Sequence, residues 1–197
     1  MDSKKPHRHF KIFKPDGFLS QFITNQSKAK KKNMLGQLYD FPEGTMAAGR
    51  LDEGSEGLLI LTTDGKVSAE ITASGMEKSY CAQVDGIITQ EAIDKLKNGL
   101  EISINGRKHQ TKPCQAELKG IDPNFPAPNK KIRASRHGPT SWVTIVLTEG
   151  KFRQVRKMTA VVGFPTLRLV RDRIGTLNLN KMQPGDVEEI SWPQKKD

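Results

Sequence analysis

Turn signals divide this chain into short apolar runs, and this pattern limits the folds that the chain can adopt. Pro15-Asp16-Gly17, Asp64-Gly65 and Asp85-Gly86 each close a run of apolar or alternating residues. Runs bounded in this way by proline, aspartate and glycine are typical of β-strands. Strands are expected from Phe10 to the turn at Pro15, and over residues 19–23, 57–61, 79–84, 142–147 and 167–171.

Other segments carry helix signals. Thr89 is expected to be the N-cap of a helix whose apolar residues recur near helical spacing and which stops at Gly99. Residues 152–162 are expected to form a second helix, which ends before Gly163, and residues 66–73 one or two helical turns. Strands joined mainly by hairpin-like connections, together with a few helices, predict an α+β domain with a mixed sheet.

The chain is expected to hold one domain between two short tails. Residues 1–9 and 193–197 are polar and rich in basic side chains, which is typical of flexible tails, so the folded domain is expected over residues 10–192. Residues 121–139 combine four prolines with several basic side chains. That composition predicts a surface loop within the domain.

The charge balance points to a polyanionic partner. Lysine and arginine number 32 against 22 acidic residues, a net charge of +10. Such an excess is typical of nucleic-acid binding, although ordinary solubility charge is the alternative. Charge alone leaves a ribosomal protein, an RNA enzyme and a DNA-binding protein open. The lysine run at 28–32 is either a solvated loop or a phosphate-contacting one, and the basic residues of 130–136 are a further candidate for phosphate contact.

The residues that usually bind metals or cofactors form no familiar pattern. Cys81 and Cys114 stand far apart, and the four histidines lack metal-binding spacing. Glycine-rich phosphate loops are also absent from the sequence, and no apolar run approaches the roughly 20 residues of a membrane span. We therefore expect no metal, no cofactor, no membrane span and a cytoplasmic location.

Residues 48–57 are the first candidate for a site. They read Ala-Gly-Arg-Leu-Asp-Glu-Gly-Ser-Glu-Gly, with three glycines, three carboxylates and an arginine between two apolar stretches. The glycines allow sharp turns and a close approach to a ligand. Leu51 is expected to point into the core, which would present Asp52 at the floor of a cleft. The alternative is an acidic turn without chemistry.

The expected helix 152–162 and the strand 79–84 supply further candidates. At helical spacing, Arg153, Arg156 and Lys157 cluster on one face, and apolar residues fall on the opposite face. Basic helix faces are usually only solvated, but this one belongs to a basic protein. Tyr80, on the strand, is either a core aromatic or a platform for a base.

Taken together, these segments resemble the signature of the RsuA-type pseudouridine synthases. The first motif is Gly49-Arg50-Leu51-Asp52 with its continuation from Ser55 to Gly65, and the second is Lys78-Ser79-Tyr80. The third runs from Glu149 to Met158 and continues as 163–169. The motifs occur in the family's order and span residues 10–190. Three ordered motifs are far more specific than an isolated Gly-Arg-Leu-Asp.

The resemblance implies a fold and a reaction. The fold is the pseudouridine synthase fold, a curved, mixed and mainly antiparallel sheet with flanking helices, two subdomains and a central basic cleft. The reaction breaks the N1–C1′ bond of a uridine, turns the uracil over and joins C5 to C1′, without a cofactor. The implied partner is ribosomal RNA, with 23S rRNA favoured and small-subunit rRNA and tRNA as alternatives, and the implied state is a monomer.

The resemblance also implies roles for individual residues. Asp52 matches the catalytic aspartate, which either attacks the sugar or removes a sugar proton. Tyr80 matches the tyrosine that packs on the flipped uracil, and Arg156 the basic residue that pairs with the aspartate. RNA contacts are expected from Arg50, Lys78, Arg153, Lys157 and Arg168.

Two departures from the family and two other functions bear on these expectations. Because its first strand starts near Phe10, the chain is expected to lack the N-terminal S4 domain that several members carry. It also has Phe13-Lys14-Pro15 where members often have Asn-Lys-Pro. A non-catalytic RNA-binding protein would explain the charge, but it would not need Asp52, Tyr80 and Arg156 together. A metal-dependent nuclease would need clustered metal ligands, and the sequence shows no cluster with suitable spacing.

Overall fold

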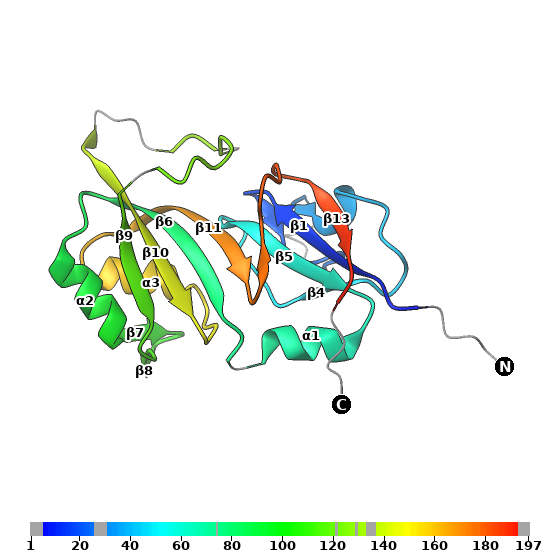
Figure 1. The fold of residues 1–197 in the computed structure, drawn as a ribbon, viewed down its shortest axis with the longest axis horizontal. Helices are drawn as coiled ribbons and strands as arrows, with labels where there is room; N and C mark the ends of the chain where they lie inside the picture. The colour runs from blue at the N-terminus through cyan, green and yellow to red at the C-terminus, as the bar shows by residue number, and fades with distance from the viewer. Residues whose placement is uncertain are drawn as a thin grey trace. The chain divides into compact units, whose positions relative to one another are not determined.

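The computed structural model describes residues 6–25, 31–73, 75–120, 122–128, 130–132 and 137–192. The chain divides into two compact units. The first consists of Met1–Ala73 with Lys181–Asp197, and the second of Ser74–Asn180. Each unit has its own antiparallel strands and its own α-helix or helices, which can be followed in Figure 1.

The first unit is built on two long neighbouring strands. β1 (His9–Lys14) pairs antiparallel with β5 (Glu56–Thr62) and, on its other side, with β13 (Val187–Ile190). β4 (Met46–Ala48) pairs with β5. Every residue of β5 is buried, which explains why the sequence between Glu56 and Thr62 is a continuous apolar run rather than an alternation.

Short elements complete the first unit. β2 (Phe18–Leu19) and β3 (Asn33–Met34) form a small parallel pair, which leads into the 3₁₀ turn η2 (Leu35–Gln37). α1 (Gly65–Thr72) contacts β4 and β5, and the side chain of Asp64 caps it by accepting from the Lys66 N–H at 2.8 Å. The core of this unit gathers Phe10, Ile12, Leu35, Leu59 and Leu61.

The described part of the second unit contains antiparallel strands and two α-helices. Its strands run in the order β11 (Thr166–Ile174), β6 (Lys78–Asp85), β10 (Thr140–Leu147) and β9 (Gln115–Lys119), and β12 (Leu177–Asn178) pairs with β11. Apolar side chains of α2 (Gln90–Asn98) and α3 (Gln154–Val161) join those of the sheet in one buried core. This core fixes the position of α3 on the sheet.

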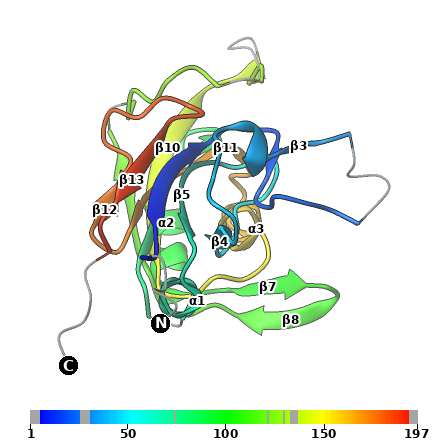
Figure 2. The same ribbon diagram turned by 90° about the vertical axis from the view of Figure 1, so that its right-hand side faces the viewer.

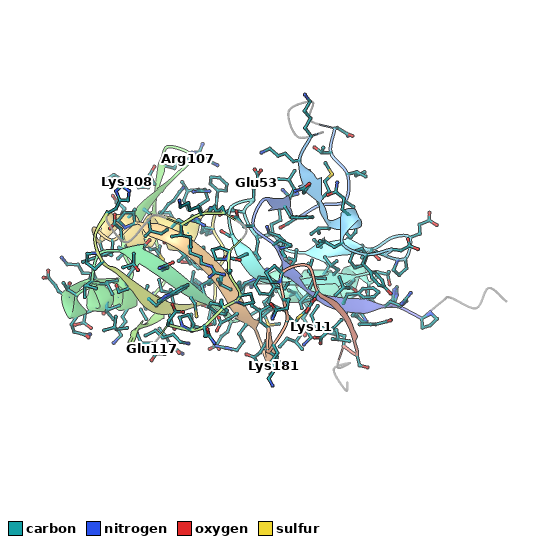
Figure 3. The ribbon with its side chains drawn as sticks, turned by 90° about the horizontal axis from the view of Figure 1, so that it is seen from above. Lys11, Glu53, Arg107, Lys108, Glu117 and Lys181 are labelled. Carbon is teal, nitrogen blue, oxygen red and sulfur yellow. The ribbon has the colours of Figure 1, made fainter. Side chains whose placement is uncertain are left out.

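A hairpin extends from the second unit. It pairs β7 (Glu101–Ile104) with β8 (Arg107–Gln110), and Figure 2 shows it projecting away from the sheet of its unit. Its turn residues, Asn105 and Gly106, both have positive φ, as a two-residue hairpin turn requires. Figure 3 shows the side chains of Arg107 and Lys108 on this hairpin.

The α+β class is confirmed, and several expected elements need correction. Only the first residue of the expected strand 19–23 is extended, within β2; Ser20–Phe22 form a bend. The second long helix begins at Gln154 rather than 152, because Arg153 has a left-handed backbone with φ of 53°. The chain is already in β1 at His9, and Arg8 forms an ion pair of 2.7 Å with Glu189, so the expected tail is anchored at its end.

Several of the described strands were not foreseen from the sequence: β3, β4, β7, β8, β9, β12 and β13. Most of their residues are exposed or half-buried, so they carry little apolar alternation. Pairing partners distant in the sequence, such as β1 for β13, define several of them. Among the described residues, no helix is long and apolar enough to cross a membrane.

The two cysteines provide a test of the second unit's packing. Burial raises the pKa of both the Cys81 and the Cys114 thiol to about 11. At pH 8 each thiol should therefore hold about 200-fold less thiolate than a model cysteine of pKa 8.5. We expect a disulfide reagent to titrate both thiols rapidly in guanidinium and at least about 100-fold more slowly in the native protein. Native rates close to those of a model thiol would contradict the packing around these side chains.

Candidate functional site

The loop between β4 and β5 places Asp52 at the start of a tight turn. Gly49 begins the loop with φ of 79°, a left-handed conformation that favours glycine. The Ser55 N–H donates to the Asp52 carbonyl at 3.0 Å, which closes a turn with Glu53 and Gly54 at its centre. Asp52 itself is half-buried, so a residue that carries a carboxylate is held in a defined turn.

A neighbouring segment clamps this turn on one side of Asp52. The Ser20 hydroxyl accepts from the Leu51 N–H at 2.9 Å and lies 2.7 Å from the Leu51 carbonyl oxygen, to which it donates. Ser20 is buried, and so is Leu51, as the sequence predicted. The backbone just before Asp52 is therefore held by a paired contact in a dry environment.

The other side of Asp52 is held by Lys14. Its ammonium is buried and donates to the carbonyl oxygens of Pro15 at 2.8 Å, Phe18 at 2.7 Å and Glu53 at 3.4 Å. The Gly17 N–H adds a bond of 2.8 Å to the same Glu53 carbonyl. The side chain of Glu53, labelled in Figure 3, forms an ion pair of 2.5 Å with Lys32.

In the second unit, Tyr80 lies on β6 between two neighbouring strands. It pairs with Ile145 on β10 and with Arg171 on β11, and its half-buried ring packs against the unit's core. The buried Arg171 places its guanidinium carbon 6.0 Å from the centre of the Tyr80 ring. The strands on both sides of β6 thus fix the orientation of the Tyr80 ring.

Lys78 lies two residues before Tyr80, close to the same arginine. Its Nζ donates to the Met76 carbonyl at 3.1 Å. Burial and the charge of Arg171 both lower the pKa of Lys78. The sequence offered Arg171 only as part of the basic strand 168–173, a candidate for phosphate contact, and not as a neighbour of Tyr80. A bulge between Arg171 and Arg173 interrupts the alternation along β11.

The entry to α3 is organised around two buried polar side chains. Gln154 accepts from the Lys151 N–H at 3.0 Å and donates to the Glu149 carboxylate at 2.7 Å. Glu149 also accepts from the Lys112 N–H at 2.9 Å, and His109 lies 3.3 Å from its other oxygen. Burial acts to raise the pKa of Glu149, but these hydrogen bonds outweigh it and the pKa is lowered. In the sequence, Glu149 and Gln154 stood out only as parts of a motif.

The basic residues of α3 differ in their surroundings. Arg153, the N-cap, is exposed, whereas Arg156 and Lys157 are half-buried. Arg156 donates to the Thr166 carbonyl at 3.3 Å, and Lys157 donates to the Ser103 carbonyl at 2.6 Å. On the opposite face Val155 and Met158 are buried, as expected, whereas Val162, also expected there, is half-buried at the C-cap.

The remaining predicted residues lie in different settings. Arg50 is exposed at the start of the Asp52 loop. Arg168 is buried, donates to the Pro126 carbonyl at 2.6 Å and lies 5.9 Å from the ring centre of Phe125, so it contacts a loop of its own unit. Its role in RNA binding stays a prediction. Residues 28–30 of the lysine run and the arginines at 133 and 136 lie outside the described residues.

Apart from Arg168, the predicted residues thus lie in three groups, each on its own segment of the chain. Arg50 and Asp52 share one loop of the first unit, while Lys78 and Tyr80 share β6 of the second. Arg153, Arg156 and Lys157 occupy the start of α3. The expected ion pair between Asp52 and Arg156 and the central basic cleft stay predictions. In the described part of the chain, no three histidine, cysteine or acidic side chains are grouped as a metal site would require.

Comparisons with known proteins give consistent results along most of the chain. Residues 9–161 match the family model described as RNA pseudouridylate synthase. The chain is 40% identical, over 91% of its length and 74% of the relative, to ribosomal large subunit pseudouridine synthase E of Vibrio vulnificus. It is 37% identical to the protein of that name from Xanthomonas axonopodis, over 87% of each. It is 30% identical to ribosomal large subunit pseudouridine synthase B of Bacillus subtilis, over 93% of the chain and 68% of the relative.

Solved structures agree at the level of the fold. A crystal structure of a pseudouridylate synthase superposes with a TM-score of 0.74 at 24% identity, covering 96% of this chain and 72% of that one. A chain of a Cbf5-Nop10-Gar1 complex superposes with a TM-score of 0.56 at 13% identity, covering 88% of this chain and 50% of its own length. The shared feature is the arrangement of strands and helices.

The clamp on the Asp52 turn can be tested through Ser20. Ser20→Ala leaves the buried Leu51 N–H without its partner, which should cost about 1–3 kcal/mol of unfolding free energy. We expect a lower Tm and faster hydrogen exchange of the Leu51 amide. Ser68→Ala, within α1 and away from this turn, is the control and should change both by little. Unaltered exchange at Leu51 in Ser20→Ala would mean that the hydroxyl does not hold the turn.

Proposed function

Because the chain belongs to the RNA pseudouridylate synthase family, we propose that it isomerises a specific uridine of ribosomal RNA, and that this uridine lies in the 23S rRNA of the large subunit. Membership makes the protein an isomerase of uridine in RNA. The choice of ribosomal RNA rests on relatives named as ribosomal large subunit pseudouridine synthases, among them the one with 40% identity. The single observation that carries the site is the half-buried Asp52 on a turn clamped from both sides.

The chemistry we propose is centred on the Asp52 carboxylate. The N1–C1′ bond of the uridine breaks and a C5–C1′ bond forms; C5 loses a proton and N1 gains one, so the product is an isomer of the substrate. Asp52 either attacks the sugar or removes a sugar proton. In both cases the carboxylate has to be ionised and aimed, and a clamped turn limits the movement that would spoil its aim.

Tyr80 is proposed to pack on the uracil during the reaction. A base inside a stack is out of reach, so the target has to leave its neighbours, and an aromatic ring can then support it. The Tyr80 ring is half-buried, and its orientation is fixed by β10, β11 and Arg171. Its hydroxyl is also a candidate for accepting the C5 proton.

Arg156 is proposed to pair with Asp52 and to aim its carboxylate. A neighbouring guanidinium favours the charged form of a carboxylate, most strongly where water is excluded. Arg156 is half-buried on α3, whereas Arg153 is exposed at its N-cap. This difference supports Arg156 for the ion pair and Arg153 for contact with phosphate.

RNA binding is proposed to involve Arg50, Lys78, Arg153, Lys157 and Arg168. The net charge of +10 favours association with the phosphate backbone. We further propose that the protein acts as a monomer in the cytoplasm. A non-catalytic RNA-binding protein would share the charge, and only a test of isomerisation separates the two possibilities.

The first test replaces the proposed catalytic carboxylate. Asp52→Asn keeps the shape of the side chain and removes its charge, so we expect loss of several powers of ten in turnover with nearly unchanged RNA affinity. Pseudouridine formation is measured on 23S rRNA fragments. A chelator is added in a parallel assay and should leave the turnover of the wild type unchanged. Mapping pseudouridines in rRNA from cells that lack the protein identifies the modified uridine. Glu53→Gln is the control, since it neutralises the adjacent acid of the same turn. Turnover of Asp52→Asn above about 1% of wild type would contradict an essential role.

The second test separates the two arginines of α3. Arg156→Ala should lower kcat by about 100-fold or more, because Asp52 loses the charged partner that aims its carboxylate. Arg153→Asn removes a charge while suiting the left-handed backbone at that position, and it should keep kcat at saturating RNA. It should raise the Kd and reduce the slope of log K against log salt by about 0.7–1. If Arg153→Asn lost kcat and Arg156→Ala did not, the two roles would be exchanged.

A further inference from the structure

Phe152 is an aromatic side chain that the fold leaves at the surface. It lies in the turn before α3, and 58% of its surface is exposed, whereas Phe10 and Phe13 of β1 are fully buried. A large ring exposed to water contributes little to the core, so burial does not explain its presence. Single exposed apolar residues are common, and only the surroundings of this one make it notable.

Basic side chains precede and follow Phe152 in the sequence, and another approaches its ring from α3. Lys151 and Arg153 are its exposed neighbours in the sequence. The ammonium of Lys157 lies over the ring, 5.2 Å from its centre, and is itself held by the Ser103 carbonyl of β7 at 2.6 Å. A cation placed over one region of the ring still leaves more than half of the residue exposed.

The backbone around Phe152 is fixed rather than loose. The Lys151 N–H donates to the side chain of Gln154, and the Gln154 N–H donates back to the Lys151 carbonyl at 3.1 Å. Gln154 is in turn bonded to Glu149 at 2.7 Å. These contacts bracket Phe152, so the ring is presented from a defined turn.

We propose that Phe152 is a stacking platform for an unpaired base of the RNA, a role that rests on the proposed function. An aromatic ring flanked by cations matches the two parts of single-stranded RNA, a flat base and a phosphate on either side of it. Phe152 does not take part in the isomerisation itself. It adds affinity and orients the RNA strand beside the start of α3, and it reads no particular base because every base has a flat face.

The test separates an aromatic role from a merely apolar one. Phe152→Leu keeps an apolar side chain without a flat ring, and Phe152→Tyr keeps the ring. The matched control is Val161→Ala at the other end of α3, where Val161 is 57% exposed. Binding is measured with an unstructured RNA oligonucleotide that carries 2-aminopurine, whose fluorescence falls when the base stacks.

We expect Phe152→Leu to raise the Kd by about 5–150-fold, the range for losing one stacked base. Wild type and Phe152→Tyr should quench the 2-aminopurine, and Phe152→Leu should not. Val161→Ala should bind as wild type does. The Tm of every variant should stay close to that of wild type, because the ring is not part of the core, and kcat at saturating RNA should also be retained.

Two results would overturn the inference. Binding and quenching by Phe152→Leu at the wild-type level would make the side chain a simple apolar contact. Loss of binding in Phe152→Tyr to the same extent as in Phe152→Leu would exclude a role for the ring. The proposed function is tested separately, by wild-type isomerisation of 23S rRNA fragments. Because the oligonucleotide assay does not depend on turnover, either proposal can fail while the other stands.

Discussion

The buried ammonium of Lys14 is the interaction on which the candidate site of the first unit depends. A buried charge is costly unless polar groups satisfy it, and here three backbone carbonyl oxygens do so. One of them belongs to Glu53, next to Asp52. The hydrogen bonds that stabilise the buried ammonium therefore also hold the shape of the Asp52 turn. Ser20 adds a second contact on the other side of Asp52. A substitution at Lys14 would therefore disturb the turn as well as the core.

The second unit uses the same principle around α3. Gln154 and Glu149 are buried polar side chains that bond the backbone of the turn before the helix, and His109 links them to β8. Arg153, with its left-handed backbone, lies between this bonded turn and the first helical residue. Because buried hydrogen-bonded networks are rigid, the basic residues that follow are presented from a fixed helix start.

Similarity at the level of the fold extends further than similarity in sequence. Superposition persists at 13% identity with a TM-score of 0.56, whereas the relatives with 37–40% identity share a name tied to the ribosomal large subunit. Such a fold can host different substrates, so the fold alone does not choose one. Phe152 is exposed while the nearby Gln154 is buried, so the side chain of Phe152 contributes little to the core.

The sequence by itself determined the α+β class, the apolar strands and the segments that carry Asp52, Tyr80 and Arg156, because apolar periodicity, turn residues and ordered motifs are local signals. Tertiary structure alone decided the rest. The exposed strands β8 and β13 are defined by pairing with their partner strands rather than by apolar alternation. The clamp by Lys14 and Ser20 and the ring contact of Arg171 also join residues far apart in the chain. Such contacts arise only when packing removes water and forces each buried polar group to find a partner.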